Sequence, residues 1–308
     1  MFETENFSFL LLILVAFALT RAKLDQGAFE RIPKLLFNLC YPAVILISFA
    51  GMDGGVFGSE SLFIMGFSAV YTVVFYLLTL ALLRRYKRAD RKDLIAFYMV
   101  ANNVVFVGLP FIAYFFGGWG VRLAILFNVA QDFFIWSFCY GMFAGRGSVR
   151  QTLKVMLNPC FVAVIAGVAL AGTGTSVPGL IAPPLALLAD MTAPLALLCI
   201  GSLLAQNAGA LRAISRDAVF AVLAKTFVLP AVVFGILTLA GVESALVTFA
   251  AFIAILPAAL LSVIFSKEFG KDVAFANVLF VLSTGMFILV NVGLYLGQRA
   301  FGFALLAG

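Results

Sequence analysis

Ala101-Asn-Asn-Val-Val-Phe-Val-Gly-Leu-Pro110 places two amides, a glycine and a proline in the middle of a stretch that is otherwise apolar enough to cross a bilayer. Proline removes a backbone donor and disfavours helical geometry in the residue before it, so we expect a break between Val107 and Pro110. In hydrocarbon, unpaired backbone groups are tolerated only where they face protein or water. A break at that depth therefore predicts a binding site.

A second apolar segment, Phe249-Ala-Ala-Phe-Ile-Ala-Ile-Leu-Pro257, is also broken by a proline. Paired interrupted segments, one in each half of a chain, are typical of the binding centre of a secondary transporter. A proline fits the first turn of a helix, so Pro110 and Pro257 are each expected to begin a half-helix whose amino-terminal end points inward. Such ends carry free N–H groups and partial positive charge, which favour an anion and most simply a carboxylate. The alternative is that the prolines only kink packed helices and that Asn102 and Asn103 bond across a helix interface.

The composition identifies a membrane protein. Apolar residues make up 64% of the 308-residue chain and charged residues 11%, with a mean hydropathy of +1.14. A soluble domain is nearer half apolar. The net charge of +6 lies in short clusters between apolar runs, which is typical of topology signals and not of a nucleic-acid-binding surface. Acidic Glu3 and Glu5 predict that the first apolar run is retained and is not a cleaved signal.

The sequence lacks the residues on which most enzymes depend. It contains no histidine, which removes the commonest metal ligand and general base. Its four cysteines are scattered through apolar segments, without the paired spacing of a disulfide framework or a zinc site. We therefore expect no enzyme activity, no cofactor and no metal.

Ten apolar segments follow one another along the chain, and most reach the roughly 20 residues that a helix needs to cross a ~30 Å hydrocarbon core. They are 7–21, 33–51, 61–83, 93–116, 121–143, 155–172, 181–205, 217–240, 244–265 and 272–297. The sequence thus predicts an all-α polytopic protein with ten transmembrane helices.

The distribution of lysine and arginine supports this number of helices. Seventeen of the twenty basic residues fall in loops that ten spans would put on one side, among them the cluster from Arg84 to Lys92 and the group Arg146, Arg150 and Lys154. Only Arg122 and Arg299 fall on the other side. Because positive residues concentrate on the cytoplasmic side, both termini are expected outside the cytoplasm of the inner (plasma) membrane.

The two halves of the chain, 1–150 and 151–308, resemble each other. Asn38-Leu-Cys-Tyr-Pro42 in the second apolar segment corresponds to Asp190-Met-Thr-Ala-Pro194 in the seventh, as the two proline breaks correspond. A five-helix unit repeated once must have its copies in opposite orientations, because five is odd. Such 5+5 inverted repeats underlie alternating access in secondary transporters, with the site near the midplane where the repeats meet.

Three stretches carry a resemblance to a known family: Asn103-Val-Val-Phe-Val-Gly-Leu-Pro110, Leu198-Cys-Ile-Gly-Ser-Leu-Leu-Ala205 and Leu256-Pro-Ala-Ala-Leu-Leu-Ser-Val-Ile-Phe-Ser-Lys-Glu-Phe-Gly270. With them the whole chain resembles the auxin efflux carrier family, which includes plant PIN carriers and bacterial carriers of malonate, malate and related acids. The resemblance implies a fold like that of the bile-acid and sodium/proton carriers, with ten helices and with helices 4 and 9 broken and crossing. It also implies a homodimer in which a transport domain, helices 3–5 and 8–10, moves in an elevator-like way against a scaffold of helices 1, 2, 6 and 7.

The resemblance also assigns residues. The substrate-facing asparagine of the family falls on Asn103, and its helix-5 glutamine falls near Gln131. The long cytoplasmic loop of many plant members is absent between the fifth and sixth segments, so the chain resembles a bacterial-type member.

Three formal charges lie inside predicted spans, Asp132, Asp190 and Lys225, and each costs about 2.5–3.5 kcal/mol at a helix centre. Asn128, Gln131 and Asp132 share one helical face, which predicts a polar stripe toward the interior. We hypothesise that Asp132 and Lys225 form a coupling or charge-compensating pair in place of the sodium sites of related carriers, and that an acid left unpaired carries a proton with the substrate. The alternatives are that Lys225 extends to the cytoplasmic edge and that Asp190 has an interfacial or capping role.

The sequence therefore predicts a secondary carrier or uniporter of small organic anions such as malonate, malate or auxin-like acids, driven by a proton gradient or by the gradient of the substrate itself. The expected partners are the substrate, the lipid bilayer and a second copy of the chain, with no nucleic acid. The alternatives are a sodium-coupled symporter of the bile-acid type and a membrane sensor or channel on the same fold. The candidate substrate-binding residues come from the two broken segments and the fifth segment: Asn102, Asn103, Gly108, Pro110, Asn128, Gln131, Pro257 and Ser262.

Overall fold

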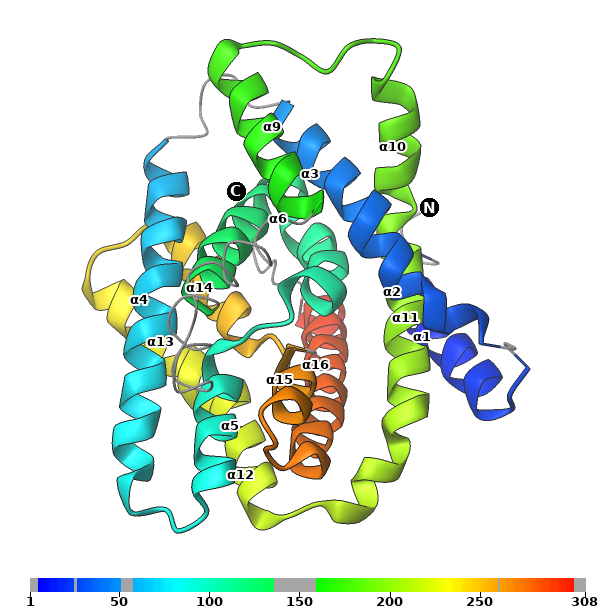
Figure 1. The fold of residues 1–308 in the computed structure, drawn as a ribbon. Helices are drawn as coiled ribbons and strands as arrows, with labels where there is room; N and C mark the ends of the chain where they lie inside the picture. Colours follow the sequence, from blue (N-terminus) through cyan, green and yellow to red (C-terminus); the bar gives the residue numbers. More distant parts are fainter. Residues whose placement is uncertain (1–4, 25–26, 51–57, 136–158, 260, 302–308) are drawn as a thin grey trace.

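The computed structural model describes residues 5–24, 27–50, 58–135, 159–259 and 261–301 (Figure 1). Within these ranges the chain is helical apart from turns and short extended stretches, and the only strand-like pairing is an isolated antiparallel bridge between Asn102 and Ala258. The α-helices are α1 (Glu5–Arg21), α2 (Ile32–Leu35), α3 (Tyr41–Ala50), α4 (Ser59–Leu82), α5 (Ala89–Val100), α6 (Leu109–Phe134), α9 (Pro159–Thr173), α10 (Ala182–Asp190), α11 (Thr192–Asn207), α12 (Arg216–Leu223), α13 (Leu229–Leu239), α14 (Ser244–Ile255), α15 (Leu261–Glu268) and α16 (Val273–Phe301).

Six helical segments of the described chain are long and apolar enough to cross a membrane: Ile32–Phe49, Ser59–Arg85, Val104–Phe134, Ala182–Ala213, Arg216–Leu239 and Val273–Leu294. Three shorter apolar helical segments accompany them: Leu10–Arg21, Pro159–Thr173 and Ser244–Ile255. The predicted class, an all-helical polytopic membrane protein, is therefore confirmed for the part of the chain that the structure describes. The predicted span end 136–143 and the basic residues Arg146, Arg150 and Lys154 lie outside the described residues.

Three single π-turns, η2 (Leu36–Cys40), η5 (Val104–Gly108) and η8 (Ala224–Val228), each continue directly into an α-helix whose second residue is a proline. A proline has no N–H to donate to the preceding turn. A π-turn widens the helix at that place, so the chain passes the proline without leaving the helix. The prolines absorbed in this way are Pro42, Pro110 and Pro230.

The predicted unwinding between Val107 and Pro110 takes the form of the wider π-turn η5, whereas the extended part of the segment lies elsewhere. Both residues are helical, and the first extended stretch is residues 101–103, earlier in the same segment. Pro110 lies in the first turn of α6 as predicted, whereas Pro257 does not begin a half-helix, because it lies inside the second extended stretch, residues 256–259, ahead of α15. Beyond η5, α6 consists of two helical parts joined at Gly117, where φ is 59° and ψ is −157°, and this kink lies in the predicted loop between the fourth and fifth segments.

The helices pack in two groups (Figure 1). The α1 group comprises α1, α2, α3, α9, α10 and α11, and the α4 group comprises α4, α5, α6 and α12 to α16. Each group draws helices from both halves of the sequence. Within the α1 group, α1 and α11 approach closely because α11 has Gly201 at the contact, where an added Cβ would meet the carbonyl of Ile13 and lie 2.9 Å from the Cβ of Ala16. Between the groups, α3 contacts α6, and α11 contacts both η5 and α6.

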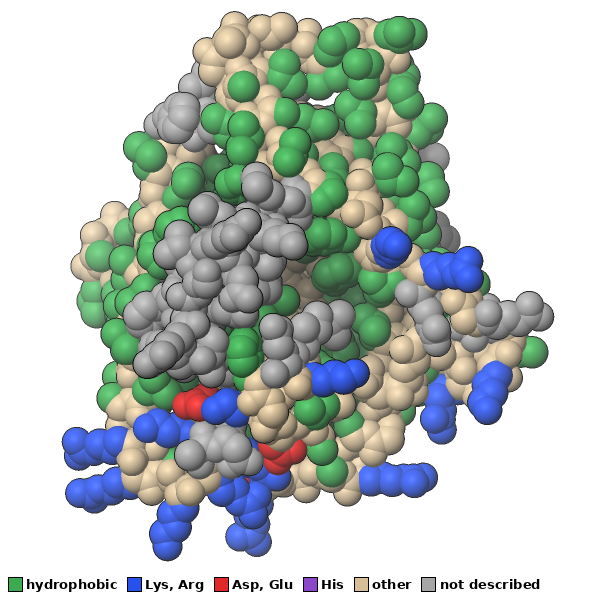
Figure 2. All heavy atoms as spheres, viewed as in Figure 1, with side chains coloured by type: hydrophobic (Ala, Val, Ile, Leu, Met, Phe, Trp, Pro, Cys, Tyr) green, Lys and Arg blue, Asp and Glu red, His purple; other side chains and the backbone are tan. Residues whose placement is uncertain are grey.

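One end of the molecule is basic. Figure 2 shows most of the lysines and arginines on this face gathered beyond the apolar body, at the end where α4 connects to α5 and where α12 begins. Arg84, Arg85, Lys87 and Arg88 are all exposed there. A basic end next to an apolar body is the pattern of a membrane protein whose apolar surface contacts lipid.

Candidate functional site

Two extended stretches from opposite halves of the sequence, residues 101–103 and 256–259, cross inside the α4 group. The backbone N–H of Asn103 donates to the carbonyl of Pro257 over 2.9 Å, and the N–H of Ala259 donates to the carbonyl of Ala101 over 2.9 Å. Asn102 and Ala258 therefore face each other as an antiparallel bridge. These bonds provide partners for backbone groups that no helix supplies, which a chain buried at membrane depth requires. We call this pair of stretches the crossing.

Side chains from two long helices hold the remaining backbone groups of the crossing. The Nε2 of Gln131 in α6 donates to the carbonyl of Val100 over 2.7 Å, and its Oε1 accepts from the N–H of Asn102 over 3.3 Å. On the other stretch, the N–H of Ala258 donates to the Oγ of Ser283 in α16 over 3.1 Å. Gln131 and Ser283 are both buried. Both stretches are thus held in fixed positions.

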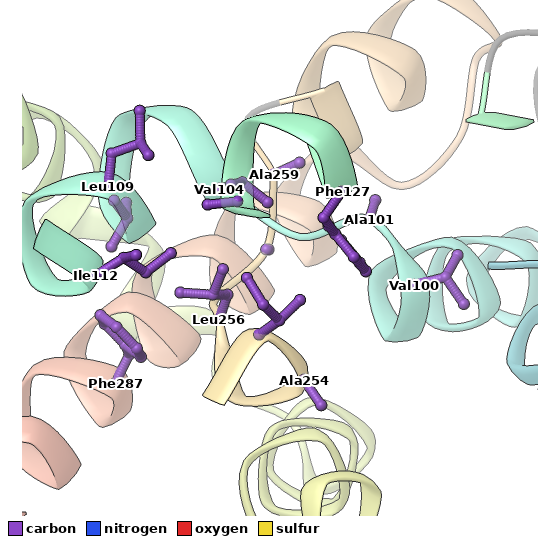
Figure 3. Close-up of a cluster of buried hydrophobic side chains, with 14 of the residues drawn as sticks. Val100, Ala101, Val104, Leu109, Ile112, Phe127, Ala254, Leu256, Ala259 and Phe287 are labelled. Atoms are coloured by element: carbon purple, nitrogen blue, oxygen red, sulfur yellow. The ribbon is translucent and has the colours of Figure 1, made fainter. Parts of the chain in front are cut away.

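Apolar packing surrounds the crossing. Figure 3 shows Leu256 of the second broken segment among buried side chains of the first broken segment, Val104 and Ile112, and of α16, Phe287. Gly108 leaves room for this leucine, because an added Cβ would lie 3.0 Å from Leu256 Cδ1. Pro257 thus lies within the crossing and Gly108 beside it, and the predicted role of Gly108, Pro110 and Pro257 in substrate binding stays a prediction.

Asn103 occupies the amino-terminal end of a helical segment at the crossing. Its carbonyl accepts from the N–H of Gly108 over 2.9 Å and from that of Val107 over 3.3 Å, so the segment η5–α6 begins immediately after it. The first N–H groups of a helix have no partner within the helix, and they carry the positive end of its dipole. Asn103 is buried, at 5% exposure. This end of η5 therefore offers donors to an anion.

Lys225 brings a positive charge to the same place from η8. Its Nζ donates to the Oδ1 of Asn102 over 2.7 Å and to the carbonyl of Met99 over 2.8 Å, and it lies 5.4 Å from the centre of the Tyr98 ring. The Lys225 side chain is almost completely buried, at 1% exposure. None of the ion pairs between described residues includes Lys225. Its acceptors are therefore neutral oxygens, and its charge has no carboxylate partner in that part of the chain.

The predicted pair of Asp132 and Lys225 is wrong for this conformation. Asp132 instead accepts a 2.9 Å hydrogen bond from the Nδ2 of Asn128 and is half-buried. The alternative that Lys225 extends to the cytoplasmic edge is also wrong, because its ammonium is bound at the crossing. Of the predicted polar stripe, Gln131 reaches the crossing, whereas Asn128 and Asp132 bond to each other.

Two further candidate residues, Asp190 and Ser262, offer no free polar group to a ligand at the crossing. Asp190 is the last residue of α10 in the α1 group and is exposed, and α10 packs against α3 and α11. Ser262 is buried beside the crossing, but its hydroxyl donates to the carbonyl of Ala259 over 2.7 Å, the local bond that hydroxyls in helices commonly make.

Sequence reasoning missed Tyr71 of α4. Its hydroxyl donates to the carbonyl of Met99 over 2.9 Å and lies 3.5 Å from the Oδ1 of Asn102, so it shares both acceptors of Lys225. A tyrosine in an apolar segment is too common to mark a site. The usable signal is that a buried tyrosine hydroxyl requires a hydrogen-bond partner, which the neighbouring apolar residues of α4 do not supply.

The described helices and their apolar surface are those of a polytopic helical membrane protein, in which two interrupted segments cross. The family model for membrane transport proteins matches residues 5–154 and residues 148–295. The chain belongs to this family, the auxin efflux carrier family, as the sequence resemblance predicted. No curated protein matches the chain in a direct comparison.

Proposed function

We propose that this membrane transporter carries small organic anions and that the carboxylate of the substrate binds at the crossing. The observation that supports this most is the pairing of an amino-terminal helix end at Asn103 with the buried ammonium of Lys225, which binds the neighbouring Asn102. Two positive features at one buried place favour a negative ligand.

The electrostatics of Lys225 favour the same ligand. A buried charge without an opposite partner costs several kcal/mol, even when neutral acceptors surround it. A carboxylate bound at the crossing supplies the missing negative charge in a surrounding of low dielectric, where the attraction is strong. The charge of Lys225 would then be unbalanced in the free protein and balanced in the substrate-bound protein.

A donor without a partner gives the anion a contact. The Nδ2 of Asn102 is buried and has no hydrogen-bond partner among the described residues. Buried polar groups are almost always bonded, so open donors at a candidate site indicate a ligand. The family resemblance suggests malonate, malate or auxin-like acids as the substrate class.

The transport mechanism that we propose is elevator-like. Ten membrane spans would form two inverted five-helix repeats, residues 1–150 and 151–308, with the α1 group as scaffold and the α4 group as the moving part of a homodimer. The mixed origin of each packing group and the meeting of both halves at the crossing support this arrangement. The basic end of the molecule would face the cytoplasm, with both termini on the other side of the inner (plasma) membrane.

We propose a proton as the coupling ion and Asp132 as the group that carries it, because Asp132 is a half-buried carboxylate bonded to the neutral Asn128. The sodium-coupled alternative has less support. The ammonium of Lys225 already occupies the oxygens of Met99 and Asn102, which a sodium ion at the crossing would use. The sensor or channel alternative also has less support, because neither would require the buried charge of Lys225 beside the helix end at Asn103.

A thermal-shift screen of the purified protein against malonate, malate, succinate, lactate and indole-3-acetate tests the substrate class, because a ligand that binds the folded state raises the Tm. We expect at least one acid to raise the Tm and Asn103→Ala to remove that rise. The matched control is Asn291→Ala, because Asn291 is a buried asparagine that bonds within α16. An undiminished shift in Asn103→Ala would move the anion site away from the crossing.

Uptake into proteoliposomes tests the coupling. In wild type, an imposed pH gradient should drive accumulation of the acid in sodium-free buffer, and in Asp132→Asn the gradient should lose its effect. Uptake by Asp132→Asn that keeps the full dependence on the gradient contradicts the proposed role of Asp132. Accumulation that requires sodium supports the alternative.

A further inference from the structure

The carbonyl of Val105 lacks its partner within the helix because of Pro110. At the end of the π-turn η5 two successive N–H groups bond five residues back: that of Gly108 bonds Asn103 and that of Leu109 bonds Val104. The next residue is Pro110, which would donate to the carbonyl of Val105 but has no N–H. That carbonyl therefore has no partner within the helix. A buried carbonyl of this kind requires a donor from elsewhere.

The donor comes from the other packing group. The hydroxyl of Tyr41, the first residue of α3 in the α1 group, donates to the carbonyl of Val105 over 2.7 Å. The Tyr41 ring also meets the Phe106 ring edge to face, with centres 5.6 Å apart. Tyr41 is 1% exposed, so water cannot readily replace it. The two groups are therefore joined by a buried hydrogen bond at η5, the turn that begins after Asn103.

The same arrangement occurs a second time, but within one group. In η2 the N–H of Tyr41 bonds the carbonyl of Leu36, and the next residue, Pro42, leaves the carbonyl of Phe37 open. The Sγ of Cys160 in α9 lies 3.4 Å from that carbonyl and donates to it. Phe37 lies in η2, between α2 and α3, and α9 packs in the same α1 group, so this bond does not connect the two groups. It provides a matched control for the bond that Tyr41 makes.

We propose that Tyr41 is a positioning residue whose hydroxyl ties the α1 group to the turn that carries Asn103, and that this bond must open when the two groups move past each other. The inference rests on the proposed function, because it requires the α4 group to move during transport. The hydrogen bond and the ring contact of Tyr41 are with Val105 and Phe106 of η5 and not with residues 101–103 or 256–259. It acts through η5, by holding the helix end that Asn103 begins in the conformation described here.

The removal of the hydroxyl should therefore change the balance of conformations and leave the anion site intact. Tyr41→Phe keeps the ring and its contact with Phe106, so the protein should fold. A net hydrogen bond corresponds to roughly a two- to tenfold change in an equilibrium constant. We expect Tyr41→Phe to lower the population of this conformation, relative to the alternative one, by about that factor.

The test measures distances between two spin labels on non-natural residues, one at Lys34 in α2 and one at Arg85 after α4, in lipid nanodiscs. Both positions are exposed, one on each group, and the native cysteines stay in place. Wild type should give two label-to-label distances, one for each conformation, and the ratio of their populations should change with substrate. Without substrate, Tyr41→Phe should shift this population ratio, and Cys160→Ala should not. A ratio in Tyr41→Phe equal to that of wild type overturns the role of Tyr41.

Pro110→Ala provides a second and independent test. The new N–H at residue 110 can donate to the carbonyl of Val105, so this carbonyl no longer depends on the hydroxyl of Tyr41 for a donor. In the Pro110→Ala background, Tyr41→Phe should shift the ratio by less than it does alone. An equal shift in both backgrounds overturns the inference.

The two proposals fail in different ways. A single distance in wild type, with and without a carboxylate that raises the Tm, overturns both the moving group and the role of Tyr41 while the anion site stands. Two distances with no effect of Tyr41→Phe overturn the role of Tyr41 alone.

Discussion

The ammonium of Lys225 and the carboxamide oxygen of Asn102 lie 2.7 Å apart, although 123 residues separate them in the chain. The bond joins η8 in one half of the sequence to the crossing stretch of the other half. It also fixes the orientation of the Asn102 carboxamide: with Oδ1 held by the ammonium, the open donor Nδ2 is the atom left for a ligand. A positive charge that orients a donor is an arrangement suited to an anion and unsuited to a free metal cation.

Lys225→Met should weaken carboxylate binding by tenfold or more while the protein still folds. The substitution removes the charge and keeps most of the volume, and replacement of a buried charge by an apolar side chain often costs little stability. Tyr71 still donates to Met99. The measurement is the Kd for the best acid of the thermal-shift screen, with the exposed Lys267→Met as control. An unchanged Kd in Lys225→Met would show that the ammonium has only a structural role.

Gly108→Ala should destabilise the protein by roughly 1–3 kcal/mol, because overpacking a buried contact forces neighbours out of their preferred positions. The new Cβ would lie 3.0 Å and 3.2 Å from the two Cδ atoms of Leu256, which is completely buried. The measurement is the Tm in detergent. Gly66→Ala in α4 is the control, since no heavy atom lies within 4 Å of its added Cβ. Leu256→Val should recover part of the loss in Gly108→Ala. Equal Tm values for the two alanine variants would contradict the close packing of the crossing.

The sequence predicted the region of the crossing but not its position within the segment. Prolines mark where a helix has a missing bond, and Pro110 and Pro257 do lie in the two segments that meet. A π-turn absorbs Pro110, however, and the chain is extended at residues 101–103 instead. The partners of these extended residues come from the other half of the chain, and no local pattern reveals such a long-range pairing.

The charges were harder to predict than the break. Opposite charges inside spans usually pair, which favoured Asp132 with Lys225. The structure gives Lys225 two neutral oxygens and gives Asp132 the amide of Asn128. Helical spacing predicted which side chains share a face on α6, and spacing on one helix carries no information on how far that face lies from η8.

Arg91→Gln should lower stability by about 1–2 kcal/mol, because it breaks the junction of three helices at the basic end. Two N–H groups of Arg91 in α5 bind the Oδ2 of Asp272 over 2.8 Å and 2.9 Å, and Asp217 of α12 lies 3.7 Å away. The guanidinium also lies 4.5 Å above the Phe275 ring of α16. Because the Arg91 side chain is 17% exposed, solvent screens part of its attraction to the two carboxylates.

The Tm in low salt measures this loss, with the exposed Lys87→Gln as the control. High salt should narrow the difference between wild type and Arg91→Gln, since salt screens partly exposed ion pairs. If Lys87→Gln lowers the Tm as much as Arg91→Gln does, the ion pairs at this junction contribute nothing specific.

The ionisation of Tyr86 should make the free energy of unfolding depend on pH in alkaline solution. It lies just beyond the end of the α4 span, and its hydroxyl donates to the Oδ2 of Asp217 over 2.5 Å. Burial and this bond to a carboxylate raise the pKa of Tyr86 to about 12, whereas an unfolded tyrosine has a pKa of about 10. Below about pH 10 both states keep the proton and the stabilisation is complete. Between about pH 10 and 12 the unfolded chain loses the proton first, so the free energy of unfolding falls as the pH rises.

Tyr86→Phe has no proton to lose, so its Tm should fall less steeply than that of wild type from about pH 10 upward, although it starts lower because the bond to Asp217 is gone. Asp217→Asn should give an intermediate slope, since an amide still accepts the bond but carries no charge to oppose ionisation. The measurement is the Tm of the three proteins in steps of half a pH unit, with the difference from Tyr86→Phe taken at each pH to remove the titration of other groups. Parallel curves for wild type and Tyr86→Phe would mean that the hydroxyl of Tyr86 ionises as readily in the folded protein as in the unfolded chain.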